Sequence, residues 1–379
     1  MNIKFAFAIP TYNRYKQLKR AVDSIINQKR DSDVEVTVVL SNSFSDDKTF
    51  NYIEELLSQK SDINFVAFNE ERKTSNIVEG EENWYNLSEK IPVSIDWVWL
   101  LGDDDYLYNT DSLSTVCDLI RTHKQKNLKL IHACQARRSQ SSGRVFFAPL
   151  YKLCNDFGFL EILGWMSSII CDREIAVTAL AAGHKQKLHK KSAHNMSAFW
   201  HSTAILKKAF DDNAIFLDLP LVEPQDSEQT PESIKRWQNE NIGERYFYVA
   251  DDLKEIIQKT DIPKFSRKFF RYHTYNIWDR YISFQISALL NQGQNQNFEH
   301  GSEFRQRWNK NWHCIISLIQ MLSESHEQKN LALQCQATYD LANLWLDGKC
   351  DKQLATMYIK RIQNLVNQPI YEFKILESD

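Results

Sequence analysis

Three consecutive aspartates, Asp103, Asp104 and Asp105, follow an apolar run that reads SIDWVWLLG. Clustering like charges costs Coulomb energy unless a cation neutralises them. Carboxylate oxygens suit Mg²⁺ or Mn²⁺, and Mg²⁺ is usually held by one or two carboxylates while phosphates and water complete its octahedron. The pattern therefore predicts a metal-bridged diphosphate at the end of a buried strand. A solvated acidic turn is the alternative explanation of the same three residues.

The chain before these aspartates alternates between strand and helix periodicity. Apolar runs of strand length are separated by apolar residues that recur at helical spacing. This alternation predicts an α/β fold with a mostly parallel sheet and helices on both faces. Open sheets of this kind bind ligands outside the carboxyl ends of their strands, which is where the aspartates fall. The expected strands are residues 3–9, 34–40, 63–68 and 95–101, and the expected helices include residues 18–26 and 50–57.

Composition and length narrow the class of protein. The 379 residues are 43% hydrophobic and 25% charged, which is typical of a soluble globular protein and long enough for two domains. A net charge of −3 argues against a general nucleic-acid binder. The seven cysteines contain no CxxC pair and indicate reduced thiols in a cytosolic protein. No apolar segment approaches the about 18 residues that span a bilayer, so we expect a cytoplasmic location.

Two common nucleotide-binding motifs are missing from the sequence, but three other segments form a recognisable combination. Neither G-x-G-x-x-G nor G-x-x-x-x-G-K-[ST] occurs, which argues against a dinucleotide enzyme and a P-loop NTPase. The segments FAIPTYNR, VVLSNSFSDDKT and VWLLGDDDYL, in this order, resemble the family 2 glycosyltransferases of the GT-A fold over about residues 4–226. This resemblance implies a GT-A catalytic domain over residues 1–230. The pattern beyond residue 230 predicts a mostly helical C-terminal domain over residues 231–379.

The resemblance also implies where a nucleotide-sugar donor binds. In the second loop the family usually places an Asp that accepts the N3 hydrogen of uracil, and here Asn42 occupies that position, with Ser43 next to it. An Asn carbonyl can accept the same bond, although its NH₂ group would also suit another base. A UDP-sugar is the expected donor, and a different base stays open. The family's first loop, which lines base and ribose, corresponds to Pro10, Thr11, Tyr12 and Arg14.

The aspartates correspond to the metal motif of the family. Its D-x-D pattern makes Asp103 and Asp105 the ligands of Mn²⁺ or Mg²⁺, and Asp104 contacts ribose or the metal. The cation neutralises the charge that grows on the nucleoside diphosphate as the glycosidic bond breaks. Asp105 is the first choice for a direct ligand.

An inverting transferase also needs a general base for the acceptor hydroxyl. Relatives often carry a Glu-Asp pair about 80–100 residues after the metal motif, whereas this chain has SAFWHSTAILKKAF there. His201 in that segment is a candidate base, because its pKa lies near neutrality, or a further metal ligand. A structural histidine hydrogen-bonded in the core is the alternative. Asp172 and Glu174 are rival bases.

A basic aromatic segment lies in the C-terminal part. Between residues 264 and 290, aromatic and apolar residues recur at helical spacing beside five basic residues. Such a helix can lie on an anionic membrane surface, here the inner face of the cell membrane, or dock onto its own catalytic domain. Both interpretations stay open.

Together with these features, the resemblance implies an inverting, metal-dependent glycosyltransferase that uses a nucleotide-sugar donor. The resemblance implies a glycan or lipid-linked glycan acceptor in bacterial surface polysaccharide, capsule or lipopolysaccharide synthesis. A nucleotidyltransferase shares strand-end carboxylates, but usually has a Gly-rich, basic first loop that PTYNRYK lacks. A degenerate transferase fold that acts as a binding or scaffold subunit is the non-enzymatic alternative. Donor binding without turnover would favour the scaffold.

Overall fold

The computed structural model describes the backbone of residues 2–69, 80–190 and 199–225, together with scattered residues between 253 and 357. The chain divides into two units. The first comprises Met1–Ala193 and Phe199–Ile234, and the second comprises His194–Ala198 and Lys235–Asp379.

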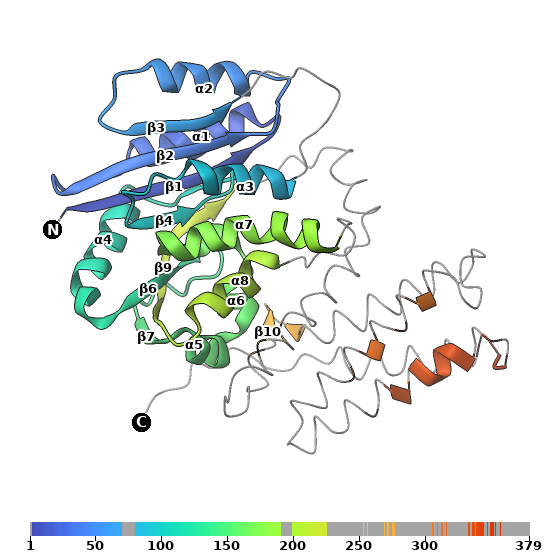
Figure 1. Ribbon diagram of the computed structural model, residues 1–379. Helices are drawn as coiled ribbons and strands as arrows, with labels where there is room; N and C mark the ends of the chain where they lie inside the picture. Colours follow the sequence, from blue (N-terminus) through green and yellow to red (C-terminus); the bar gives the residue numbers. More distant parts are fainter. Residues whose placement is uncertain are drawn as a thin grey trace. The chain divides into compact units, whose positions relative to one another are not determined.

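The first half of unit 1 confirms the predicted alternation of strands and helices (Figure 1). Four strands lie side by side in the order β3-β2-β1-β4, and all of their pairings are parallel. Their carboxyl ends therefore meet at one edge of the sheet. The elements are β1 (Ile3–Thr11), α1 (Tyr15–Ile26), β2 (Val34–Asn42), α2 (Thr49–Ser58), β3 (Asn64–Asn69), α3 (Gly80–Lys90) and β4 (Trp97–Leu100).

The second half of unit 1 departs from the expectation of a mostly parallel sheet. The sheet continues β4-β8-β6-β9-β5, with β7 also pairing β9. Strand β8 runs antiparallel to both neighbours, and β9 is antiparallel to β5 and β7. The sheet is therefore mixed. The elements are β5 (Asp105–Leu107), α4 (Ser112–His123), η1 (Lys124–Lys126), β6 (Leu128–Gln135), β7 (Val145–Pro149), α5 (Leu150–Phe157), α6 (Phe159–Leu163), η2 (Met166–Ser168), β8 (Ile169–Asp172), α7 (Arg173–Lys190), α8 (Trp200–Ala209) and β9 (Asn213–Pro224).

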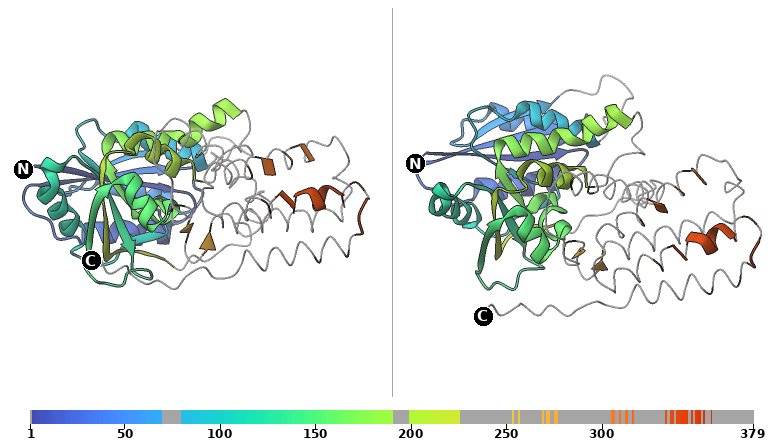
Figure 2. Two further views of the ribbon diagram at one scale, coloured as in Figure 1. Left: turned by 90° about the horizontal axis from the view of Figure 1, so that it is seen from below. Right: turned by 60° about the horizontal axis from the view of Figure 1, so that its bottom comes forward.

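Strand β1 shows how the sheet is covered on both faces. Because successive side chains point to opposite faces, Phe5, Phe7 and Ile9 enter a core shared with α1, α2 and α4. Ala6 and Ala8 point to the other face, where α3 contacts β1 and their small side chains allow close approach. Helix α7 packs beside α3 and α8 on this face (Figures 1 and 2).

The loop after β1 is tied to the loop after β2. Asn13, the residue before the N-cap of α1, takes a left-handed conformation with φ 51°. Its N–H donates to Ser45 Oγ at 2.8 Å. The N-cap position is Arg14, without a side-chain capping bond, and Asp47 Oδ2 accepts the N–H of Tyr15 at 3.1 Å. Residues distant in sequence therefore satisfy the start of α1, which fixes the backbone of Arg14 at the sheet edge.

The described residues of unit 2 contradict one expectation. Strands β10 (Arg271–Tyr272) and β11 (Tyr275–Asn276) pair antiparallel, so residues 264–290 do not form one continuous helix. The rest of that segment, and with it the membrane interpretation, lies outside the described residues. Within the part of the chain that the structure describes, no helix is both long and apolar enough to cross a bilayer.

Candidate active site

The three aspartates, hereafter the aspartate cluster, lie at the edge where the parallel strands end. Asp103 Oδ2 accepts the hydroxyl of Thr11, the last residue of β1, at 2.9 Å. Arg14 Nη1 bridges two carboxylates, at 2.9 Å from Asp103 Oδ1 and 2.8 Å from Asp104 Oδ2. The Asp103 side chain is only 8% exposed, whereas that of Asp104 is 34% exposed. The cluster is therefore a partly buried set of paired charges, which contradicts the solvated acidic turn.

Asp105 is held from the opposite side by a residue of η2. The Ser167 hydroxyl donates to Asp105 Oδ2 and accepts the N–H of Gly102 at 2.8 Å. A Cβ on Gly102 would lie 2.9 Å from both Asp104 Oδ1 and Asp105 Oδ2. Only glycine leaves room for these two carboxylates to converge at this point.

Burial changes the acidity of the buried carboxyls. The pKa of Asp105 is raised to about 8, chiefly by desolvation and also by the Asp104 charge, while the Ser167 hydrogen bond opposes this rise. Desolvation also raises the pKa of Asp103, while the Arg14 charge beside it opposes the rise. A cation bound beside Asp103 and Asp105 would lower both pKa values, because it favours the ionised carboxylates.

The loop after β2 corrects the prediction for Asn42. Its side chain is fully buried, and its Nδ2 donates to Asn69 Oδ1 at 2.8 Å. Its Oδ1 accepts both the N–H and the hydroxyl of Ser45, at 3.1 and 2.5 Å. The oxygen predicted to accept the base hydrogen is thus already used inside the loop by Ser45. Ser43 is also buried, and its N–H donates to the Thr11 carbonyl at 3.0 Å.

The remaining residues of the first loop are more accessible. Pro10 and Tyr12 are both half-buried, and Pro10 pairs in register with Ser41 of β2. Tyr12 directly follows Thr11 at the carboxyl end of β1. These positions stay available to line a nucleotide, whereas the Arg14 guanidinium faces the aspartate cluster.

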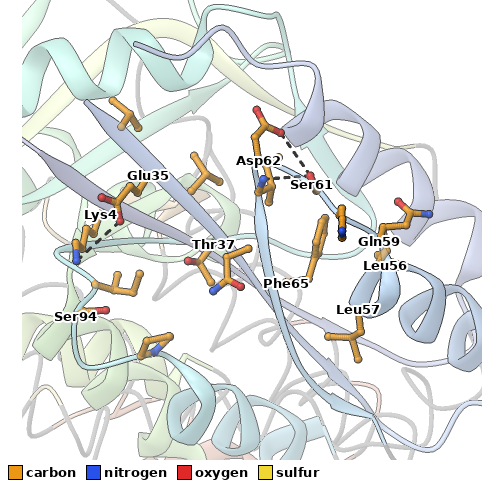
Figure 3. Close-up of a pocket in the computed structure, with 17 residues that line it drawn as sticks. Lys4, Glu35, Thr37, Leu56, Leu57, Gln59, Ser61, Asp62, Phe65 and Ser94 are labelled. Carbon is orange, nitrogen blue, oxygen red and sulfur yellow. Dashed lines mark hydrogen bonds and ion pairs between the residues drawn. The ribbon is translucent and has the colours of Figure 1, made fainter. Parts of the chain in front are cut away.

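A pocket of about 600 Å³ lies at the other edge of the sheet (Figure 3). Its walls include the amino ends of β1, β2 and β3, with Lys4, Glu35 and Phe65 among the side chains. The full length of the parallel strands lies between this edge and the opposite edge, where the strands end and the aspartate cluster lies. The pocket is therefore not part of the site around the aspartate cluster.

Comparison with known proteins agrees with this geometry. Residues 6–153 match the profile of the family described as Glycosyl transferase family 2. These residues carry a glycosyltransferase family 2 domain. The comparison with curated proteins gives no match.

Solved structures share the fold of this glycosyltransferase. The crystal structure of S. aureus TarS 1–349 matches 99% of this chain and 95% of its own, with 14% identity and a TM-score of 0.51. Its complex with UDP-GlcNAc matches the same shares with 15% identity and a TM-score of 0.52. At such identities the likeness establishes the GT-A fold.

Two predicted bases of the glycosyltransferase are misplaced. Strand β8 runs antiparallel to β4, and Asp172 pairs with Trp97 at the start of β4. The length of β4, about 10 Å at 3.3 Å per residue, separates Asp172 from the edge that carries the aspartate cluster. Asp172 instead binds Lys129 Nζ at 2.9 Å and accepts the Glu174 N–H. Glu174, 75% exposed, pairs with Lys208, so neither carboxylate can reach an acceptor at the cluster.

His201 is buried at the start of α8, as the structural-histidine alternative expected. It is 6% exposed in the first turn of α8, and backbone groups of Leu163 and Gly164 hydrogen-bond its ring. Gly164 is three residues before Ser167, whose hydroxyl reaches Asp105. Burial lowers the pKa of His201 to about 4, which keeps the ring neutral near pH 7. Its Nε2 is buried, and among the described residues this atom has no hydrogen-bond partner.

Three residues around the cluster were not predicted. Gly102 lies in the quoted segment VWLLGDDDYL, but no spacing in the sequence singles out Gly102 or Ser167. Gln225, just after β9, donates its N–H to the Asp104 carbonyl at 2.7 Å. Its contact arises because β9 returns antiparallel to β5, a pairing between residues more than 100 positions apart.

The cluster also fits a divalent cation. Among the described residues, no group of three or more His, Cys, Asp or Glu side chains is arranged to hold a metal ion by itself. A cation that arrives with a diphosphate needs only one or two carboxylates. Asp104 and Asp105 converge above Gly102, and the Arg14 guanidinium already stands as a positive charge between two carboxylates. Hard carboxylate oxygens in this arrangement suit Mn²⁺ or Mg²⁺.

Proposed function

We propose that this family 2 glycosyltransferase is metal-dependent and transfers a sugar, with inversion, from a nucleotide-diphosphate donor to a hydroxyl acceptor. The three clustered aspartates at the carboxyl edge of the parallel strands, two of which converge above Gly102, carry the proposal. We also propose that the catalytic domain spans residues 1–230 and that residues 231–379 form a helical second domain.

The aspartate cluster would hold the cation and the donor phosphates. Asp103 and Asp105 are the proposed ligands of Mn²⁺ or Mg²⁺, and the exposed Asp104 contacts ribose or the metal. Such a cation stabilises the negative charge of the leaving diphosphate. Thr11 and Ser167 hold the two buried carboxylates in position, one from β1 and one from η2.

His201 is the proposed general base, since it can take the acceptor proton on Nε2. Its other ring nitrogen is occupied by the backbone, which leaves Nε2 as the acceptor in the neutral ring. The low pKa makes it a weak base, so the proton transfer must occur late, as the attacking oxygen becomes acidic.

The donor is proposed to be a UDP-sugar. Support comes from the TarS complex with UDP-GlcNAc, which has the same fold. The base would lie against Pro10, Thr11 and Tyr12, because Asn42 is closed off. We place the acceptor among glycans or lipid-linked glycans of bacterial surface polysaccharide or capsule. We place the enzyme at the inner face of the membrane, a location that suits such an acceptor.

A donor panel tests the proposal. Release of nucleoside diphosphate from UDP-, GDP- and dTDP-sugars is measured with Mn²⁺, with Mg²⁺ and with EDTA. We expect turnover with one donor class, its loss in EDTA, and its loss in Asp105→Ala. The matched control is Glu174→Gln, which removes an exposed carboxylate at the other edge and should retain full activity. Metal-dependent binding without turnover would instead support the scaffold alternative, which the missing Glu-Asp pair favours.

A further inference from the structure

Arg14 occupies the oxygens that a cation would need. One of its nitrogens, Nη1, lies within 2.9 Å of carboxylate oxygens of both Asp103 and Asp104. Charge-assisted bonds of this length are about twice as strong as neutral hydrogen bonds. A guanidinium and a dication cannot bind the same oxygens at once, so one must leave before the other enters.

The backbone of Arg14 is fixed while its side chain has room to move. Its carbonyl accepts the Leu18 N–H at 2.9 Å in the first turn of α1, and the preceding Asn13 is bonded to Ser45. The Arg14 side chain is 40% exposed. The guanidinium can therefore swing away from the carboxylates without disturbing the loop.

We propose that Arg14 is an internal counter-ion that is displaced only when metal and nucleoside diphosphate bind together. This inference rests on the metal-dependent function proposed above. A bare dication must break both Arg14 contacts and leave the guanidinium without a partner. A dication that arrives with a diphosphate brings phosphate oxygens as ligands and offers the freed guanidinium a new anion. Metal and nucleotide therefore strengthen each other's binding, and by linkage each does so by the same factor.

Arg14 also explains how the cluster is stable without a metal. Three carboxylates within one turn of chain repel one another, and two of them are buried. One guanidinium shared between Asp103 and Asp104 offsets part of that repulsion. The same guanidinium competes with a metal cation for these carboxylate oxygens. Because it holds Asp103 and Asp104 in place until the cation binds, Arg14 acts as a positioning residue for the metal-binding carboxylates.

The test measures binding and not turnover. Titration of the full chain with Mn²⁺, followed by electron paramagnetic resonance of free Mn²⁺, gives Kd values with and without saturating UDP. For Arg14→Gln we expect Mn²⁺ alone to bind about tenfold more tightly than to the wild type, equivalent to about 1.4 kcal/mol. The enhancement of Mn²⁺ affinity by UDP should shrink by the same factor. The matched control is Arg20→Gln. In the wild type the Arg20 guanidinium carbon lies 3.8 Å from the centre of the Tyr106 ring, and we expect this variant to bind Mn²⁺ as the wild type does.

Arg14→Lys gives a second variant, because Lys keeps the charge but cannot form the same fork. We expect its Mn²⁺ affinity to lie between those of the wild type and Arg14→Gln. Equal Mn²⁺ affinities for wild type and Arg14→Gln without UDP would overturn the counter-ion role and leave the proposed function standing. No Mn²⁺ binding to any of these proteins, even with UDP, would overturn the metal-dependent function and this inference together.

Discussion

Ser167 holds Asp105 and Gly102 in one arrangement, and its replacement by alanine tests how the cluster is built. The side chain is 1% exposed and makes two hydrogen bonds, one to a carboxylate and one from a backbone N–H. Ser167→Ala removes both without adding bulk. The Gly102 N–H and the Asp105 carboxyl are then left in a site too closed for water to replace the hydroxyl freely.

The magnitude follows from these two bonds. An unsatisfied buried donor costs about 1–3 kcal/mol, and a lost bond to a charged group costs about 1.5–3 kcal/mol. At pH 6 Asp105, with a pKa of about 8, is mostly protonated. The cost of losing a hydrogen bond to a charged carboxylate therefore applies only in small part at this pH. We expect Ser167→Ala to lower the free energy of unfolding by about 2 kcal/mol at pH 6 and by about 4 kcal/mol at pH 9.

The sign of the pH dependence follows from proton binding. Asp105 binds its proton more tightly in the folded state than in the unfolded state, so it lowers stability as pH rises from about 4 to about 8. Ser167 donates to the carboxylate and limits the rise in pKa. Without that donor the pKa rises further, and the loss of stability continues above pH 8.

The assay is urea denaturation of the metal-free protein in EDTA at pH 6 and pH 9. The matched control is Ser202→Ala, which is equally buried and loses a single neutral bond to the Leu163 carbonyl. It should cost about 1 kcal/mol at both pH values. A Ser167→Ala cost no larger than this control, or one that does not grow with pH, would refute the reasoning.

Three further outcomes are expected. Gly102→Ala should weaken Mn²⁺ binding in the presence of UDP, because its Cβ would lie 2.9 Å from two carboxylate oxygens; unchanged affinity by isothermal titration would show that the carboxylates need not converge. Asn42→Ala should lower the free energy of unfolding by about 1–3 kcal/mol, because Ser45 loses its acceptor. A raised donor KM with unchanged stability in urea would instead support a hydrogen bond between Asn42 and the nucleobase. His132, whose pKa burial lowers to about 4, binds no proton when folded between pH 4 and 6.5, whereas the unfolded chain does, so stability falls as pH falls through that window. His132→Gln should flatten this slope by about 1.4 kcal/mol per pH unit, and an equal slope in urea titrations would contradict the assignment.

Local sequence determined much of the fold around β1 to β4. The apolar runs at residues 3–9 and 34–40 became β1 and β2, because period and length distinguish a buried strand from a helix without tertiary information. The position of the aspartates directly after an apolar run then determined that they would lie at a strand end. The order of three motifs indicated the family.

Tertiary structure decided which candidates can act together. Asp172 was a reasonable base by spacing, but the antiparallel direction of β8 places it at the other edge of the sheet. Asn42 follows β2 as predicted, yet Ser45 uses its oxygen. The basic segment predicted as one helix contains the strand pair β10 and β11.

The physical reason is the range of the interactions. Helix and strand periodicity arises from residues within a few positions, so a window of sequence carries it. The contacts that build the aspartate cluster join Arg14 to Asp103 and Ser167 to Asp105, residues 89 and 62 positions apart. Such contacts depend on strand direction and loop packing over the whole sheet. For this reason the sequence by itself determined the carboxylates, and only the folded chain decided which residues hold them.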